Sequence, residues 1–229
     1  MGVKVQQSEL SSGIGRILRK HFGKGPESVF VSISAPYVAI YLRNFLTPME
    51  QLLLEEHHVV TVEETRDKMM QKLAPEMMGF IHAVTGIDVK EFYYDWSFKK
   101  GSGLLVGMGA ELSNLHEYNY QNSSLVEREI SLVSEEAEKY PEVTYSHMLS
   151  NRTLVVMRKG ILVKIEQELI DLGYEEALTI AKRKLEKRLL YQRKELFEDY
   201  LDAKIDDIFV NWDFTMDKSI IVFILSPHT

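Results

Sequence analysis

An internal repeat constrains the fold of this chain more than any other feature of its sequence. The two tryptophans, Trp96 and Trp212, lie 116 residues apart in the similar phrases "FYYDWSF" and "IFVNWDF". At the same spacing Glu50 matches Glu166, and hydrophobic positions pair without a gap through two strand-like regions and a helical one. A constant offset with a matching hydrophobic pattern is typical of internal duplication. We therefore expect two related units, with each tryptophan packed at the equivalent strand position of its unit.

The first unit is expected to begin with a helix and a hairpin. Hydrophobic residues recur at three- and four-residue spacing over residues 8–22, which predicts an amphipathic helix, and Gly23 suits a left-handed cap. The runs "SVFVSIS" and "YVAIYLRNF" are rich in branched and aromatic residues and are separated by Ala35-Pro36, so they predict a β-hairpin. The second unit repeats this order over residues 124–139 and 143–159.

Helices and a second hairpin are expected to complete the unit. Thr47 as N-cap, Pro48 at the first helical position and Glu50 in a capping box predict a helix start. A second Thr-x-x-Glu box predicts another helix that begins near Val62, and Pro75 should kink that helix or begin a third one. The runs "DVKEFYYDWSF" and "GLLVGMG" then predict the second hairpin.

This order of elements predicts an α+β fold in two tandem repeats. Each repeat reads helix, hairpin, helices, hairpin, which favours a four-stranded antiparallel sheet with helices on one face. The expected domains are residues 1–110 and 124–229, joined by a linker over residues 111–123 that lies along the surface through Tyr118 and Tyr120. Two such units related by a pseudo-two-fold axis would form a pseudo-dimer within one chain.

The composition limits the classes of function. The chain has 229 residues, no cysteine and a formal net charge of −7. Disulfides and thiolate metal sites are therefore excluded, and no window reaches the roughly 18 apolar residues that a membrane span requires. We expect a cytoplasmic protein with no membrane span and no cofactor, whose overall acidity disfavours nucleic-acid binding.

Several motifs of the first unit resemble a known family. The unit carries a "GKGP" turn at residues 23–26, the helix start "LTPMEQLL" at residues 46–53, Arg66, and "TGIDVKEFYYD" at residues 85–95. In these elements, over roughly residues 8–110, it resembles the MpsC or YbcI-like family of small bacterial proteins. The second unit lacks the glycine turn, the Thr-Pro cap and the Thr-Gly pair, and looks like a diverged copy.

The resemblance implies a role beside a membrane system that moves cations or supports bicarbonate supply, and some relatives are associated with one-carbon metabolism. It brings no established catalytic residues, and none are assigned. A metal site is not predicted either. His57-His58 is the densest histidine cluster, but adjacent helical residues point about 100° apart and cannot readily chelate one ion.

Three residues of the first unit are candidates for ligand binding: Lys24, Arg66 and Asp95. Lys24 lies between glycines, but a phosphate loop needs a strand before it and a helix after it, so the pattern favours a simple turn. Arg66 and Asp95 could meet near the end of the sheet as a polar pair, with a surface salt bridge as the default. A sensor for a small anion or a nucleotide, binding between the two domains, would use such residues.

The segment "KRKLEKRLLYQRK", residues 182–194, has a local charge of +6, which leaves −13 for the remainder of the chain. Leucines at positions 178, 185, 189 and 196 form an apolar stripe, so we expect the cations on the outer face of a long amphipathic helix. The alternative is a solvated helix face with ordinary side-chain pairs. The candidate partner-binding residues of this segment are Lys182, Arg183, Lys187, Arg188 and Arg193.

The leading hypothesis is a non-enzymatic accessory or regulatory protein that contacts a subunit of a membrane transport system or a dehydrogenase. The small-anion sensor is the alternative from another class. Nucleic-acid binding through residues 182–194 is a weaker one, and peripheral contact of the same residues with anionic lipid stays open. The sequence leaves the oligomeric state open.

Overall fold

The computed structural model describes residues 2–110 and 120–227. The chain divides into two compact units, Met1–Ser113 and Asn114–Thr229. Most of the expected linker, with Tyr118, lies outside the described residues. Tyr120 is described: its ring packs against the core of the second unit, and its hydroxyl lies 3.0 Å from Ser146 Oγ. The domain limits 1–110 and 124–229 and the pseudo-two-fold relation stay predictions.

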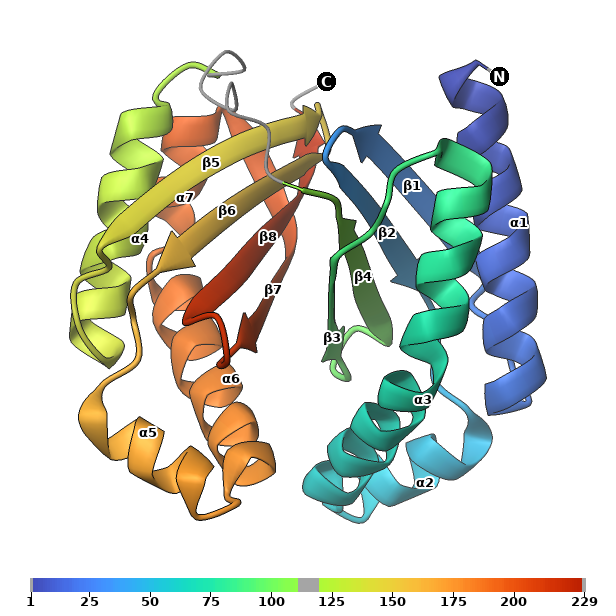
Figure 1. The fold of residues 1–229 in the computed structure, drawn as a ribbon, viewed down its shortest axis with the longest axis horizontal. Coiled ribbons are helices and arrows are strands. Elements are labelled where there is room, and N and C mark those ends of the chain that lie inside the picture. Colours follow the sequence, from blue (N-terminus) through green and yellow to red (C-terminus); the bar gives the residue numbers. More distant parts are fainter. Residues whose placement is uncertain (1, 111–119, 228–229) are drawn as a thin grey trace. The chain divides into compact units, whose positions relative to one another are not determined.

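The first unit is a four-stranded antiparallel sheet with three helices (Figure 1). Two hairpins build the sheet in the order β1-β2-β4-β3, so the second strands of the two hairpins pair at its centre. Its elements in chain order are α1 (Val3–Phe22), β1 (Ser28–Ser34), β2 (Tyr37–Arg43), α2 (Pro48–Glu55), α3 (Val59–Thr85), β3 (Glu91–Ser97) and β4 (Ser102–Met108).

The second unit repeats this topology with the sheet order β5-β6-β8-β7. The predicted α+β class, with one four-stranded antiparallel sheet in each half of the chain, is confirmed. The elements of the second unit in chain order are α4 (Ser123–Ala137), β5 (Val143–Ser150), β6 (Thr153–Lys159), α5 (Lys164–Asp171), α6 (Glu175–Gln192), α7 (Lys194–Leu201), β7 (Ala203–Asp213) and β8 (Lys218–Pro227).

Some helix boundaries differ from the prediction. The first helix begins at Val3, five residues before its expected start, and α3 begins at Val59, before the second Thr-x-x-Glu box. Pro75 does not divide α3, and Figure 1 shows this helix bending along its length. The long basic helix expected over residues 182–194 is interrupted at Arg193, which separates α6 from α7.

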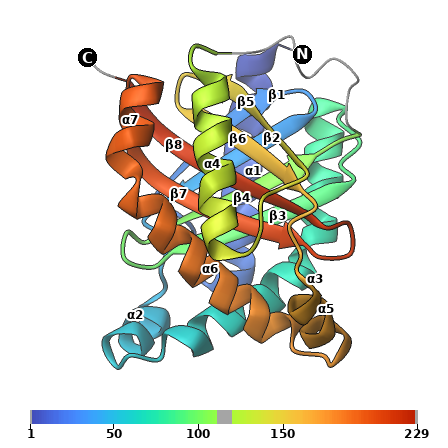
Figure 2. The ribbon, with the colours of Figure 1, turned by 90° about the vertical axis from the view of Figure 1, so that its left-hand side faces the viewer.

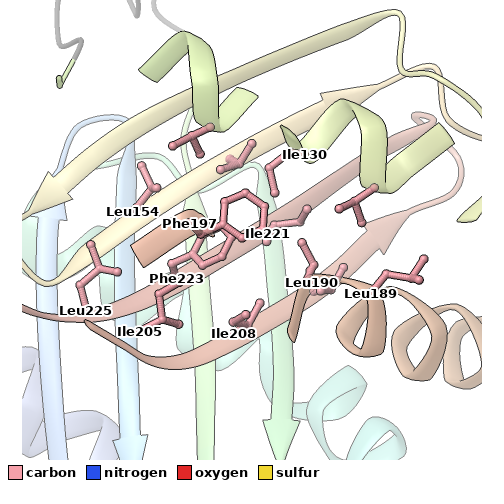
Figure 3. Close-up of a cluster of buried hydrophobic side chains, with 14 of the residues drawn as sticks. Ile130, Leu154, Leu189, Leu190, Phe197, Ile205, Ile208, Ile221, Phe223 and Leu225 are labelled. Carbon is pink, nitrogen blue, oxygen red and sulfur yellow. The ribbon is translucent and has the colours of Figure 1, made fainter. Parts of the chain in front are cut away.

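The helices cover one face of each sheet and form its core there. Side chains alternate between the two faces of a strand, so Val38, Ile40 and Leu42 of β2 all point toward α1 and α3. In the second unit Figure 2 shows α4, α6 and α7 in front of the sheet. Figure 3 shows the resulting core, in which Phe197 of α7 meets Phe223 of β8.

A close approach fixes the position of Trp96 in the first unit. Trp96 and Gly103 are direct partners in the β3–β4 ladder, and the indole ring lies over the glycine. A Cβ atom at position 103 would overlap two ring atoms of Trp96. In this position the ring is 3% exposed, and it fits there because residue 103 has no side chain.

We predict that Gly103→Ala destabilises the first unit by about 1–3 kcal/mol, because the added methyl group must displace the indole. Urea unfolding is followed by tryptophan fluorescence in a Trp212→Phe background, where Trp96 is the only tryptophan. Gly79→Ala is the matched control, since Gly79 is helical and its Cβ would have open space. Equal midpoints for the two alanine variants would contradict the prediction.

Candidate functional site

The most unusual group in the first unit is a buried arginine, Arg66 of α3, which is 1% exposed. Its Nε donates to Glu50 Oε1 at 2.7 Å, and its Nη2 donates to Glu50 Oε2 at 2.8 Å. Nη2 also donates to the backbone carbonyl of Phe45 at 2.7 Å. This two-pronged geometry is the strong form of an arginine–carboxylate pair. It joins α3 to α2 and to the segment that precedes α2.

Four aromatic rings surround the Arg66 guanidinium. Its Cζ lies 4.4 Å from the ring centroid of Trp96, 4.8 Å from Phe45, 5.5 Å from Phe22 and 5.7 Å from Phe98. A cation over an aromatic face is stabilised by the ring quadrupole, and more so where water is excluded. Nη1 has no hydrogen-bond partner among the described residues, so the rings supply its surroundings.

Glu50 has a second task at the start of α2. Its Oε2 accepts from the Thr47 N–H at 2.8 Å, while the Thr47 hydroxyl accepts from the Glu50 N–H, which completes the predicted capping box. Burial would raise the pKa of Glu50, but the hydrogen bonds and charge of Arg66, together with Thr47, lower it below its usual value. One carboxylate therefore sets both where α2 begins and where α3 is held.

The second unit repeats this arrangement with a lysine. Lys182 of α6 stands 116 residues after Arg66 and is 4% exposed. Its Nζ donates to Glu166 Oε1 at 2.7 Å and lies 5.5 Å from the ring centroid of Trp212. Glu166 Oε2 accepts from the Val163 N–H at the start of α5. A buried cation, a helix-starting glutamate and a tryptophan thus recur in both units.

More charged groups surround the buried cation in the second unit. Glu138, at the end of α4, forms an ion pair with Lys182. Arg158 of β6 donates to Glu186 Oε2 at 2.6 Å, to Ser134 at 2.6 Å and to Ser219 at 2.8 Å, and both Arg158 and Glu186 are fully buried. At the 116-residue offset the first unit has Leu42, Met70 and Gly103 in place of Arg158, Glu186 and Ser219.

The surroundings of the Glu138 carboxyl favour its protonated form and raise its pKa. Burial raises its pKa most, the nearby Glu186 carboxylate raises it further, and Lys182 offsets only part of this, which leaves the pKa at about 8. Within the described part of the chain, Glu138 Oε2 and Glu186 Oε1 have no hydrogen-bond donor. A proton on Glu138 supplies that donor.

The predicted ligand residues of the first unit are not brought together as expected. Arg66 pairs with Glu50 and not with Asp95, and it is buried, so the expected surface salt bridge is wrong. Asp95 and Trp96 are neighbours on β3 and therefore point to opposite faces of the sheet. Lys24 donates to the Leu46 carbonyl at 2.8 Å and so ties the "GKGP" turn to the start of α2.

The expectation that every cation of residues 182–194 lies on an outer helix face is wrong. Lys182 and Arg183 are buried. Lys187 is half-buried, with its Nζ 5.5 Å from the ring centroid of Phe209. Arg193 forms ion pairs with Glu129 at 2.8 Å and Glu136 at 2.7 Å. Of the candidate partner-binding residues, Arg188 is the exposed one.

Comparison with known proteins gives the family. The family model described as "Na+-translocating membrane potential-generating system (MpsC)" matches residues 4–109 and again residues 121–227. The chain belongs to the MpsC family. Uncharacterized protein YbcI of Bacillus subtilis (strain 168) is 26% identical to it over 101 residues, which are 44% of this chain and 82% of YbcI. No solved structure gave a significant match. The two matches to one model confirm the tandem copies.

The sequence contained a signal for the buried cation of each MpsC repeat. Lys182 lies four residues after Leu178 and seven before Leu189, so it stands on the apolar stripe. Arg66 likewise lies between Val62 and Met70. Within residues 2–110 and 120–227, no three His, Cys, Asp or Glu side chains lie close enough to hold a metal ion. No helix in these ranges is long and apolar enough to cross a bilayer.

We predict that Arg66→Met destabilises the first MpsC repeat by about 3–5 kcal/mol, because the buried ion pair is broken and the half-buried Glu50 carboxylate is left without its partner. Urea unfolding in the Trp212→Phe background measures this change. Glu50→Gln combined with Arg66→Met should cost less than the sum of the single changes, since the pair is removed together. Lys68→Met, an exposed cation two residues along α3, is the control and should change stability by less than about 0.5 kcal/mol. An equal loss in the control would contradict a structural role for Arg66.

We predict that the second repeat loses stability as the pH rises from about 4.5 to about 8. The folded Glu138 carboxyl keeps its proton up to a pKa of about 8, whereas the unfolded one loses it near 4.5, so folding binds a proton throughout this window. Glu138→Gln carries no titrating carboxyl and should flatten this dependence.

The measurement is urea unfolding at several pH values in a Trp96→Phe background, which leaves Trp212 as the reporter. Burial lowers the pKa of His147 in the same unit, which favours the folded state at higher pH, so the difference between the parent and Glu138→Gln is the quantity to use. Glu135→Gln, an exposed change on α4, should leave the slope as it is. Parallel slopes for the parent and Glu138→Gln would contradict the prediction.

Proposed function

We propose that this MpsC-family protein is a non-enzymatic accessory or regulatory protein that acts through protein contacts with a membrane system for cation or bicarbonate transport, or with a one-carbon metabolic system. The observation that carries the proposal is the family match, because the description of that family names a Na+-translocating, membrane potential-generating system and both repeats fall within it. The tandem arrangement supports a binding role, since two related units in one chain can present related surfaces to one partner assembly.

The placement of the charged residues supports a role in protein contacts more than a role in ligand binding. Arg66 and Lys182, which the sequence offered as binding residues, are enclosed and already paired with glutamates. A ligand would have to displace those carboxylates and enter a packed core to reach them. The geometry therefore favours a structural role for these residues and does not favour an anion sensor built on Arg66.

A pair of exposed cations recurs on the long helix of each unit. Lys184 and Arg188 lie one turn apart on α6, and both are exposed. At the 116-residue offset they match Lys68 and Lys72 of α3, which are exposed as well. We assign these two pairs, the basic pairs, as the contact points for an acidic surface of the partner. Charges at the rim of an interface mainly set its rate of formation and its salt dependence.

The test is recovery of the tagged protein with its partners from detergent-solubilised membranes of the native cell. We expect recovery of a subunit of a cation or bicarbonate transporter, or of a dehydrogenase, at low salt. Reversal of both basic pairs to glutamate should reduce recovery at least about tenfold, because four attractive contacts become repulsive. Lys99→Glu with Lys100→Glu, in the exposed turn between β3 and β4, is a milder control with two reversals.

Loss of the partner in the control variant as well would mean that net charge and not the basic pairs drives the interaction. Recovery of no transport or dehydrogenase subunit by the parent protein would contradict the proposed function itself.

A further inference from the structure

The short helices α2 and α5 carry apolar side chains on their outer surfaces. No residue of α2 is buried, and in α5 only Glu166 is. Met49 of α2 is 67% exposed, and Ile165 of α5 is 65% exposed. A surface helix ordinarily turns its apolar stripe toward the core. Here each short helix packs on the long helix that follows it (Figure 1) and keeps a second apolar surface outside.

The exposed apolar surface recurs at equivalent places in the two units. Met49 and Ile165 are separated by the 116-residue offset, at the second position of each helix. In the first unit Leu52 of α2 and Val59 and Val60 at the start of α3 are also exposed. In the second unit Leu172 and Tyr174, which follow α5, are exposed as well. Clustered exposed apolar side chains of this kind mark interaction sites.

Both surfaces belong to acidic segments of the chain. Residues 48–64 include five glutamates and no lysine or arginine, and Glu55, Glu56 and Glu64 are exposed. Residues 164–177 include Lys164 and five acidic residues, of which only Glu166 is buried. An anionic lipid surface or a nucleic acid would be repelled by this rim. A second copy of the same surface would bring like charges together.

We propose that the outer surfaces of α2 and α5 each bind a cationic amphipathic segment of a partner protein. Such a segment places an apolar stripe on Met49 and Leu52, or on Ile165 and Leu172, and its lysine or arginine side chains meet the acidic rim. An amphipathic helix on an apolar surface is a recurrent mode of recognition, with charges that set orientation and register. This inference goes beyond the proposed function, since it holds whichever membrane system the protein serves.

The test uses the purified full-length protein and a labelled helical peptide of about 18 residues made of leucine and lysine in an amphipathic pattern. Fluorescence anisotropy should show saturable binding that weakens between about 50 mM and about 300 mM salt. Met49→Ser with Ile165→Ser should weaken it at least about tenfold, because both apolar contacts are lost. The matched control is Met216→Ser, since Met216 is 47% exposed and lies in the turn between β7 and β8.

Failure of the parent protein to bind the peptide, or an equal loss in Met216→Ser, would overturn the inference. Equal binding of a leucine–glutamate peptide would also overturn it, because the acidic rim would then have no role. Sedimentation tests whether a second copy of the protein covers the surface instead. A dimer of the parent protein that becomes a monomer in the double variant Met49→Ser with Ile165→Ser would show this and would overturn the inference. The parent protein could also bind vesicles with anionic lipid and lose this binding on the same two substitutions. That result would mean that the surface binds a membrane and not a protein segment. Each of these results is separate from partner recovery through the basic pairs.

Discussion

Each unit depends on a cation buried beneath a tryptophan and held by the glutamate that starts the preceding helix. Removing a charge from water is costly unless an opposite charge and hydrogen bonds accompany it. Arg66 can therefore be buried only if α2 begins where Glu50 reaches it, and α2 begins there because Glu50 also caps it. Trp96 closes the site and needs the space left by Gly103. The start of α2, its contact with α3 and the pairing of β3 with β4 are thus linked through one cluster of side chains around Arg66.

The two units stabilise the same buried charge in different ways. A guanidinium is planar and weakly hydrated, so the aromatic rings around Arg66 can replace part of its water. The ammonium of Lys182 is compact and strongly hydrated, and a second carboxyl, Glu138, stands beside it. Burial and the nearby Glu186 carboxylate together raise the pKa of that carboxyl to about 8. The second unit has lysine in place of arginine at this position, and it also has Glu138, a carboxyl of raised pKa, beside the cation. The sheet topology of the two units is the same.

The sequence predicted the elements that local rules control. Thr47, Pro48 and Glu50 specify a helix start through contacts a few residues apart, and alternation with a turn signal specifies a hairpin. The buried charges were not predicted, because lysine and arginine are ordinarily exposed. Lys182 stands on the apolar stripe defined by Leu178 and Leu189, and position on the stripe determined its burial. The partner of Arg66 could not be chosen from sequence, since Asp95 and Glu50 were both available and only the alternation of β3 turns Asp95 away.

The duplication also separates what the fold requires from what it does not. The buried cation, its glutamate and the tryptophan recur because each unit must satisfy the same internal charge. The exposed residues that recur have no such reason, since a surface lysine or methionine contributes less than about 0.5 kcal/mol to folding in most positions. Yet Met49 and Ile165 are both apolar, and Lys68 and Lys184 are both cationic, although the second unit lacks the Thr-Pro cap and the glycine turn of the first. Folding stability alone gives little reason for these exposed side chains to recur, and this is why the proposed contacts are placed on them.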